Sequence, residues 1–131
     1  MSKGPYRTIM LIDDDIEDCE IFIDAVREVD PDIQCQCQEN GEIAISLLSL
    51  HAIENPDLFF VDLNMPKLNG KQVLVELKRN LPDIPVIMFS TFFGEQDINE
   101  IHAAGAAHHM IKHTNFNDLC KALEDVLSKK W

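Results

Sequence analysis

Three successive acids follow a short apolar run near the start of the chain. The run Ile9–Ile12 leads directly into Asp13, Asp14 and Asp15 in the stretch RTIMLIDDDIED. Neighbouring carboxylates repel one another, and a carboxylate beside an apolar run loses hydration, so both features cost free energy. Because a bound cation would offset that cost, the stretch predicts a cation site.

Polar residues also end three later apolar runs. Asp62 ends LFFVD, Ser90 and Thr91 follow PVIMF, and Lys112 ends HHMIK. With Asp13 and Asp14, they supply carboxylates, hydroxyls and one ammonium. Mg²⁺ takes oxygen ligands, a lysine suits a phosphate, and a hydroxyl donates a neutral hydrogen bond. Since phosphoryl transfer depends mainly on positioning and charge stabilisation, this set predicts Mg²⁺ and phosphoryl transfer around a carboxylate.

Two hydrophobic periods alternate along the chain and predict the elements that position these groups. Short apolar or alternating runs predict strands at Thr8–Ile12, 33–37, 58–62, 85–90 and 108–112. Apolar residues at helical spacing predict helices that span Ile16–Val29, Ile43–His51, Val73–Leu81, Ile98–Ala104 and Phe116–Leu127. The pair Asn115 and Asp118 resembles a capping box, Asn40-Gly41 is typical of a turn, and Gly105 is typical of a helix C-terminus.

Strands that alternate with helices in this way imply right-handed crossovers. We therefore predict an α/β fold with a doubly wound, five-stranded parallel sheet of order 2-1-3-4-5, flavodoxin-like, with helices on both faces. We expect a single domain over residues 1–131 and no output domain. Ligands of such sheets bind beyond the carboxyl ends of the strands, so the polar residues named above are expected to meet at one edge.

The net charge and the composition limit the kinds of partner that the chain is expected to bind. The net charge of −12 argues against nucleic acid, whose phosphates need Lys and Arg, and leaves divalent cations and basic protein surfaces. No apolar run approaches membrane-spanning length, and the N-terminus lacks the apolar stretch of a signal peptide. We therefore expect a cytoplasmic location and no membrane partner.

The cysteines and the acids of the first predicted helix are expected to have structural roles without chemistry of their own. The four cysteines are expected to be reduced core thiols, because disulfides are rare in the cytoplasm. The acids of the first predicted helix are expected to form a solvated helix face; they are Glu17, Asp18, Glu20, Asp24 and Glu28.

The segments MLIDDD, LFFVDLNMPKLNG, PVIMFST and AAGAAHHMIK, in this order and spacing, resemble the receiver domain of bacterial two-component response regulators. The likeness covers essentially the whole chain, and VDLNMPKLNG is its most specific segment. Single-domain, stand-alone regulators are the nearest match. The resemblance implies a phosphoacceptor regulator rather than an enzyme in the ordinary sense, because it would catalyse at most its own phosphorylation and dephosphorylation.

The resemblance also implies roles for individual residues. Asp62 would accept a phosphoryl group from a phosphohistidine, and Lys112 would pair with it. Asp14 would bind Mg²⁺ directly, Asp13 mainly through water, and Asn64 through its backbone carbonyl. Ser90 would be the switch hydroxyl and Thr91 its small neighbour. Pro66 and Gly70 would shape the loop after Asp62.

Two positions depart from the family pattern. The lysine is normally followed by proline, whereas His113 follows Lys112 here. We expect either a trans bond with a shifted loop or a cis bond, which costs roughly 2.5–4 kcal/mol before a residue other than proline. His109 occupies the position of the aromatic residue that turns inward on activation. It is either the rotating group or a half-exposed strand histidine.

Three function classes remain open. The first is a phosphoacceptor switch, which would receive phosphate from a histidine kinase or a histidine phosphotransfer protein. Its output face would be built from the fourth helix, the fifth strand and the fifth helix. The second is an interaction module that acts without phosphorylation. The third is a small phosphatase that uses Asp13 and Asp15 as an acid pair. Trp131 continues the last helical stripe, which predicts end-packing; an exposed Trp131 would instead anchor a homodimer.

Overall fold

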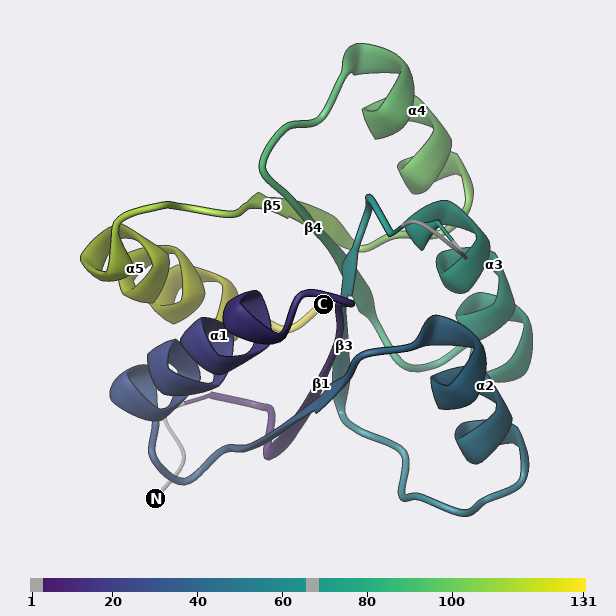
Figure 1. The fold of residues 1–131 in the computed structure, drawn as a ribbon, viewed down its shortest axis with the longest axis horizontal. Coiled ribbons are helices and arrows are strands. Elements are labelled where there is room, and N and C mark those ends of the chain that lie inside the picture. Colours follow the sequence, from purple (N-terminus) through teal and green to yellow (C-terminus); the bar gives the residue numbers. More distant parts are fainter. Residues whose placement is uncertain (1–3, 66–68) are drawn as a thin grey trace.

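The computed structural model of the chain describes residues 4–65 and 69–131. Its strands are β1 (Thr8–Ile12), β2 (Gln34–Gln38), β3 (Leu58–Asp62), β4 (Val86–Ser90) and β5 (His108–Ile111). Its helices are α1 (Ile16–Val29), α2 (Gly41–Ser49), α3 (Gly70–Asn80), α4 (Glu95–Ala103) and α5 (Phe116–Leu127). Strand and helix alternate along the described chain, as the two hydrophobic periods predict (Figure 1).

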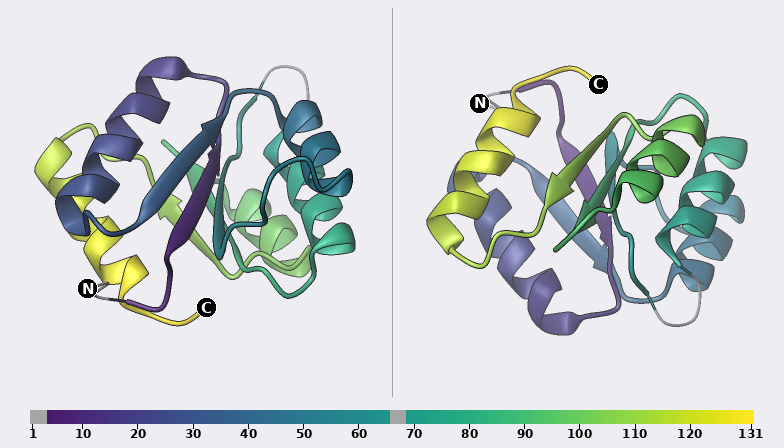
Figure 2. Two further views of the ribbon diagram at one scale, coloured as in Figure 1. Left: turned by 90° about the horizontal axis from the view of Figure 1, so that it is seen from below. Right: turned by 90° about the horizontal axis from the view of Figure 1, so that it is seen from above.

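The five strands form one parallel sheet of order β2-β1-β3-β4-β5. Helices α1 and α5 cover one face of this sheet, and α2, α3 and α4 cover the other (Figures 1 and 2). The predicted doubly wound order is therefore confirmed. The strand order reverses between β1 and β3, so the switch point of the fold lies beside Asp13 and Asp62.

Two apolar cores hold the layers together, one on each face of the sheet. Every residue of β3 and β4 is buried, which explains why these strands read as continuous apolar runs. On the face covered by α1 and α5, the ring of Phe22 packs edge-on against Phe60 and Phe89, with ring centroids 4.9 and 5.5 Å away. This packing anchors α1 to the central strands that carry the strand-end residues.

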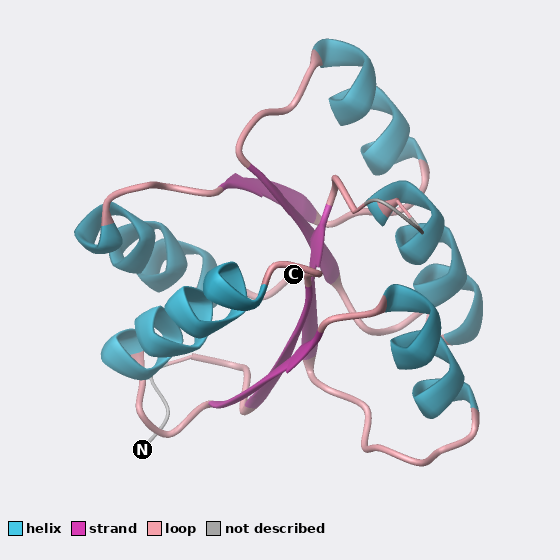
Figure 3. Ribbon diagram, viewed as in Figure 1, coloured by secondary structure: helices cyan, strands magenta, loops and turns pink. Residues whose placement is uncertain are grey.

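Side-chain caps fix where most of the helices begin. Asp15, Asn40, Asn69 and Asn115 each accept a hydrogen bond from the backbone N–H three residues later. The helices start at the edge of the sheet where the strands end, and the loops after β1 and β4 turn from strand to helix there (Figure 3). Short loops at this edge keep the strand-end residues close to the helix N-termini.

Several local expectations are refined. The second strand begins one residue later than predicted, since Ile33 precedes β2. The predicted turn at Asn40-Gly41 is the start of α2, of which Asn40 is the N-cap. His51 lies beyond the end of α2 with a positive φ of 56° instead of continuing the helical stripe. Gly105 follows α4 with a φ of 104°, as its predicted place at a helix C-terminus requires.

The expectation for the cysteines is wrong for one pair, since the structure joins Cys19 of α1 to Cys37 of β2 by a disulfide. The expectation rested on the reducing conditions of the cytoplasm, whereas the bond follows from proximity: α1 packs over β2 and brings the two Cα atoms to 6.0 Å. Cys35 and Cys120 remain free thiols.

Trp131 packs against the body of the domain, as predicted. Its indole Nε1–H donates to the carbonyl of Val126 at 2.8 Å, its backbone N–H donates to the Tyr6 hydroxyl at 2.8 Å, and its ring stacks on His108. The alternative of an exposed anchor at Trp131 is not supported. None of the described helices combines the length and the apolar character needed to span a membrane.

Candidate functional site

The carboxyl edge of the sheet brings together the predicted residues of four strands. Asp13 directly follows β1, Asp62 ends β3, Ser90 ends β4 and Lys112 directly follows β5. The Lys112 Nζ atom lies 2.8 Å from Asp13 Oδ2 and 3.5 Å from Asp62 Oδ1. The parallel topology therefore places residues that are far apart in sequence within one site.

Three carboxylates form the acidic part of this site. One oxygen atom from each of Asp13, Asp14 and Asp62 can be chosen so that all three lie within 4.8 Å of one another. Asp13 is fully buried, Asp62 is 5% exposed, and Asp14 is exposed to solvent. The cluster thus opens to solvent on the side of Asp14.

The three successive acids have separate structural roles. The backbone N–H of Asp15 donates to Asp13 Oδ1 at 3.0 Å, which fixes one oxygen of the buried carboxylate. The Asp15 carboxylate accepts from the N–H of Asp18 as the N-cap of α1. Asp13 and Asp14 therefore belong to the acidic cluster, whereas the carboxylate of Asp15 caps the start of the helix.

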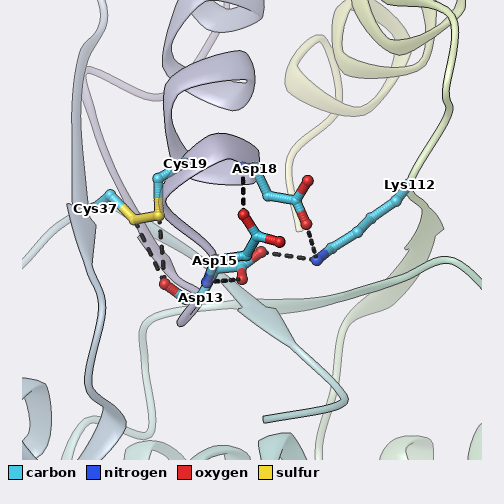
Figure 4. The surroundings of a disulfide bond; sticks show 6 residues. All are labelled: Asp13, Asp15, Asp18, Cys19, Cys37 and Lys112. Carbon is cyan, nitrogen blue, oxygen red and sulfur yellow. Dashed lines mark hydrogen bonds and ion pairs between the residues drawn. A yellow bond between two sulfur atoms is a disulfide. The ribbon is translucent and has the colours of Figure 1, made fainter.

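Lys112 is held by acids from two elements. Its Nζ atom donates to Asp13 Oδ2 at 2.8 Å and to Asp18 Oδ2 at 2.9 Å (Figure 4). Burial opposes its positive charge, but the bonds to Asp13 and Asp18 and the charge of Asp62 outweigh that effect and raise the pKa of the ammonium. Lys112 is therefore a permanent cation of the site.

The environment of Asp62 makes its ionisation more costly than in water. Burial, followed by the negative charge of Asp13, raises the pKa of this carboxyl to about 6, although Lys112 and the Asn64 N–H oppose the shift. A carboxylate that is costly to ionise without a further cation gains most from a bound metal.

The described hydrogen bonds of the Ser90 hydroxyl go to Phe92 and Asn64. The hydroxyl donates to the carbonyl of Phe92 at 2.9 Å and accepts from the Asn64 side-chain amide at 3.2 Å. The backbone N–H of Asn64 donates to Asp62 Oδ1 at 3.2 Å. Asn64 thus links the carboxylate to the hydroxyl, while Thr91 is exposed beside them.

The loop after β3 is shaped by Gly70, which begins α3. The Gly70 N–H donates to the Leu63 carbonyl at 2.9 Å, and a Cβ atom at this position would lie 2.6 Å from the Leu63 Cα. Only glycine fits here without displacing the backbone beside Asp62. Pro66, which the sequence also assigns to this loop, lies outside the described residues.

The structure gives the surroundings of Lys112 and His109, the two positions that depart from the family pattern. The Lys112–His113 peptide bond is trans, since none of the described peptide bonds is cis. Lys112 nevertheless reaches the acids, so a following proline is not required for its placement. His109 contacts α4 and the loop before it: its Nδ1 lies 2.9 Å from His102 Nε2, and its ring packs against Phe93. Burial and the neighbouring His102 lower the pKa of His109.

A pocket of about 370 Å³ lies beside Lys112, between α1 and the loop that follows β5. Its walls include Asp18, Ile21, Phe22, Thr91, His113 and Phe116. Lys112 and Asp18 thus lie together at the wall of this pocket.

Sequence reasoning missed two contacts at this site. It placed Asp18 on a solvated helix face, yet Asp18 binds Lys112, and it gave Asn64 only a backbone role, yet the Asn64 side chain binds Ser90. Asp18 lies on the first turn of α1, which starts at the site edge. No spacing in the sequence distinguishes it from the other acids of that helix.

The residues present fit a hard divalent cation. The cluster offers only carboxylate oxygens, and one of its members, Asp14, is open to solvent, as a metal that keeps several waters requires. The side chains of Asp13, Asp14 and Asp62 are those that would bind such an ion.

Comparison with known proteins identifies the family. The family description "Response regulator receiver domain" matches residues 9–124. The chain is a response regulator receiver domain. Its fold is the doubly wound sheet expected of this family, and the predicted family is confirmed.

Relatives of this receiver domain include regulators of different length. It is 28% identical to the response regulator Rcp1 of Synechocystis sp., over 96% of this chain and 90% of Rcp1. It is 32% identical to the nitrate/nitrite response regulator protein NarL of Escherichia coli, over 94% of this chain and 56% of NarL. It spans only 48% of the transcriptional regulatory protein DegU of Brevibacillus brevis, at 28% identity.

Solved structures resemble this receiver domain over most of its length. The phosphorylated cyanobacterial phytochrome response regulator RcpA has a TM-score of 0.82 at 25% identity and covers 93% of this chain and 91% of its own. The Mn²⁺-bound form of Rcp1 has a TM-score of 0.79 at 26% identity, with the same coverage of both chains. Chemotaxis protein CheY4 of Vibrio cholerae, at 20% identity and a TM-score of 0.77, shares the fold.

Proposed function

We propose that this receiver domain is a phosphoacceptor switch in which Asp62 takes a phosphoryl group from a phosphohistidine. The observation that carries the proposal is the placement of Asp62, nearly buried between a cluster of acids and the ammonium of Lys112, 3.5 Å away. A phosphorylated structure of the related RcpA supports the same chemistry here.

In the proposed reaction, an oxygen of ionised Asp62 attacks the phosphorus of the donor. A bond forms between this oxygen and phosphorus, the phosphorus–nitrogen bond breaks, and the donor imidazole leaves with the electron pair. The product is an acyl phosphate on Asp62. Lys112 balances the charge on the phosphoryl oxygens, and the backbone N–H of Asn64 keeps Asp62 aligned beforehand.

The proposed cofactor is Mg²⁺. Asp14 and Asp62 would bind it directly, Asp13 mainly through water, and Asn64 through its backbone carbonyl. When bound, the metal supplies positive charge that neutralises the acids and the phosphoryl oxygens. The existence of a Mn²⁺-bound form of the related Rcp1 supports the binding of a divalent cation by this domain.

The proposed output is a change of surface around α4, β5 and α5. A phosphoryl group adds a charge of roughly −1.5 to −2 and strong acceptors. Ser90 would leave the Phe92 carbonyl and donate to a phosphoryl oxygen, and the Thr91 N–H would face the same group. His109 packs against Phe93 and His102 and is the proposed rotating side chain on this face.

The proposed partners follow from this chemistry. A histidine kinase or a histidine phosphotransfer protein would donate the phosphoryl group at the loops around Asp62 and at α1. A downstream protein, or a second copy of the chain, would bind the face of α4, β5 and α5. A cytoplasmic location is part of the proposal, because such kinases act on their regulators there.

The proposed function is tested by phosphorylation with a small donor. The wild-type protein is incubated with Mg²⁺ and phosphoramidate, and the intact mass is measured together with that of Asp62→Asn and Asp13→Asn. We expect a metal-dependent phosphoryl adduct in the wild type that is absent from Asp62→Asn.

Two other results would each replace the proposal. A wild-type protein that forms no adduct would be an interaction module that acts without phosphorylation. An adduct that survives in Asp62→Asn and is lost in Asp13→Asn would support a phosphatase with its nucleophile on β1. The engagement of the Asp15 carboxylate as a helix cap disfavours the Asp13 and Asp15 acid pair on which that last function depends.

A further inference from the structure

Asp18 shares the site lysine with the acids of the strand ends. Its Oδ2 accepts a hydrogen bond from Lys112 Nζ at 2.9 Å, which is shorter than the 3.5 Å between Nζ and the nearer oxygen of Asp62. Figure 4 shows the ammonium between the carboxylates of Asp18 and Asp13. In this arrangement, two of the three ammonium protons point toward acids other than the proposed phosphoacceptor.

The backbone of Asp18 is fixed relative to the site. Its N–H donates to the capping carboxylate of Asp15, and the next residue, Cys19, is joined to Cys37 of β2. Helix α1 also packs against the central strands through Phe22. A carboxylate on so restrained a turn keeps its position when the lysine moves.

Asp18 also stands apart from the acids that would bind a metal. The described group of metal-competent acids consists of Asp13, Asp14 and Asp62 and does not include Asp18. A cation at that cluster would compete with Lys112 for Asp13 and Asp62, and it would leave Asp18 as the remaining counter-ion of the ammonium. The Asp18 side chain is 36% exposed and borders the pocket beside Lys112.

We propose that Asp18 is a positioning residue that holds Lys112 in a resting position on α1 and competes with the phosphoryl group for its ammonium. The proposal rests on the proposed phosphorylation of Asp62. In this proposal, Lys112 turns from Asp18 toward the phosphoryl oxygens on Asp62, whose Oδ1 lies 3.5 Å from Nζ. Asp18 therefore lowers the rate at which the domain is phosphorylated.

The experiment compares rates of phosphorylation by phosphoramidate at saturating Mg²⁺, followed by intact mass. We expect Asp18→Asn to react about three to ten times faster than wild type, the range for loss of a partly exposed, charge-assisted bond. Asp18→Glu restores the carboxylate and is expected to return the rate toward that of wild type. Glu17→Gln, the matched control, removes the same charge one residue earlier and is expected to change the rate less than about two-fold.

A double-mutant cycle separates positioning from a general structural effect. In a Lys112→Met background, Asp18→Asn is expected to change the rate no more than Glu17→Gln does. An equal acceleration in the presence and absence of Lys112 would overturn the proposal. So would a slower reaction of Asp18→Asn in the presence of Lys112.

A second measurement keeps this inference distinct from the proposed function. Modification of Lys112 by trinitrobenzenesulfonate in metal-free protein, followed by peptide mass, requires no phosphorylation. We expect faster modification in Asp18→Asn than in wild type or Glu17→Gln, and equal rates would overturn the resting contact. If wild type forms no phosphoryl adduct, the proposed function fails and competition with a phosphoryl group fails with it, whereas the modification rate still decides whether Asp18 restrains Lys112.

Discussion

The chemistry of single residues at this site is governed by a shortage of positive charge. Asp13, Asp14 and Asp62 lie around one described cation, Lys112, which Asp18 also binds. The raised pKa of Asp62, to about 6, follows from its burial and from the charge of Asp13. In the absence of metal, ionised Asp62 therefore opposes folding.

The free energy of unfolding should report this cost. Because the pKa of Asp62 is higher in the folded chain, the folded chain retains a proton between about pH 4 and about pH 6 that the unfolded chain has released. The wild-type stability is thus expected to fall as pH rises through that window. Without Mg²⁺ at pH 7, Asp62→Asn should be more stable than wild type by about 1–2 kcal/mol, measured by urea unfolding.

The exposed acid Asp83 supplies the matched control for this measurement. Asp83→Asn removes one negative charge from an exposed side chain outside the site, and it should change the difference between pH 4 and pH 7 less than Asp62→Asn does. If Asp62→Asn is less stable than wild type at pH 7 without metal, the ionised carboxylate contributes favourably to the fold and this account of the site is wrong.

At the scale of elements, two contacts hold helices close to the edge of the sheet that carries the site. Helix α3 begins so close to the end of β3 that a side chain at Gly70 would meet the backbone of Leu63 and Asp62. Helix α1 is joined to β2 through Cys19 and Cys37, directly beside Asp13. The two Sγ atoms lie 3.3 and 4.0 Å from the carbonyl oxygen of Asp13.

Gly70→Ala is expected to disturb both stability and the site. The new methyl group cannot fit without moving the β3–α3 backbone, and such overpacking costs about 1–3 kcal/mol. We expect lower resistance to urea and slower phosphorylation of Asp62. Gly94→Ala is the control, since its methyl group would meet only side-chain atoms at 3.4 Å or more. Equal stability of Gly70→Ala and wild type would contradict the close approach.

The disulfide is expected to be detectable by alkylation. In denaturant without reductant, only Cys35 and Cys120 should react, and all four cysteines should react after reduction. Since the crosslink closes a loop with a sequence separation of 18, reduction should lower the free energy of unfolding by about 2–4 kcal/mol. Alkylation of all four cysteines without reductant would show that purified protein carries the pair as thiols.

At the scale of the whole molecule, a net charge of −12 makes cations general stabilisers of the compact chain. The effect of a specific metal site must therefore be distinguished from the general screening of negative charge by salt. Ten of the 23 acids fall between Asp13 and Asp32, so the negative charge is concentrated around α1 and the site.

Mg²⁺ should stabilise the domain by mass action. At a concentration about 100 times its dissociation constant, a ligand that binds only the folded chain adds about 2.7 kcal/mol. We expect the melting temperature to rise with Mg²⁺ in wild type and Asp83→Asn, and far less in Asp14→Asn. An equal rise with NaCl at matched ionic strength would indicate screening without a metal site.

The sequence by itself determined the fold and which strand-end residues meet at one edge of the sheet. Hydrophobic periods of two kinds fixed which segments became strands and helices, and the rule for parallel sheets placed Asp13, Asp62, Ser90 and Lys112 at one edge. These inferences succeed because they depend on local spacing and on topology. Side-chain geometry does not enter them.

Only the tertiary structure decided how these side chains pair. The contacts of Asp18 with Lys112, of Asn64 with Ser90 and of Cys19 with Cys37 join segments that are distant in sequence. An acid on the first turn of a helix looks the same in sequence whether it faces solvent or a lysine 94 residues away. The choice follows from the packing of α1 across the sheet, because that packing sets the distances between charges.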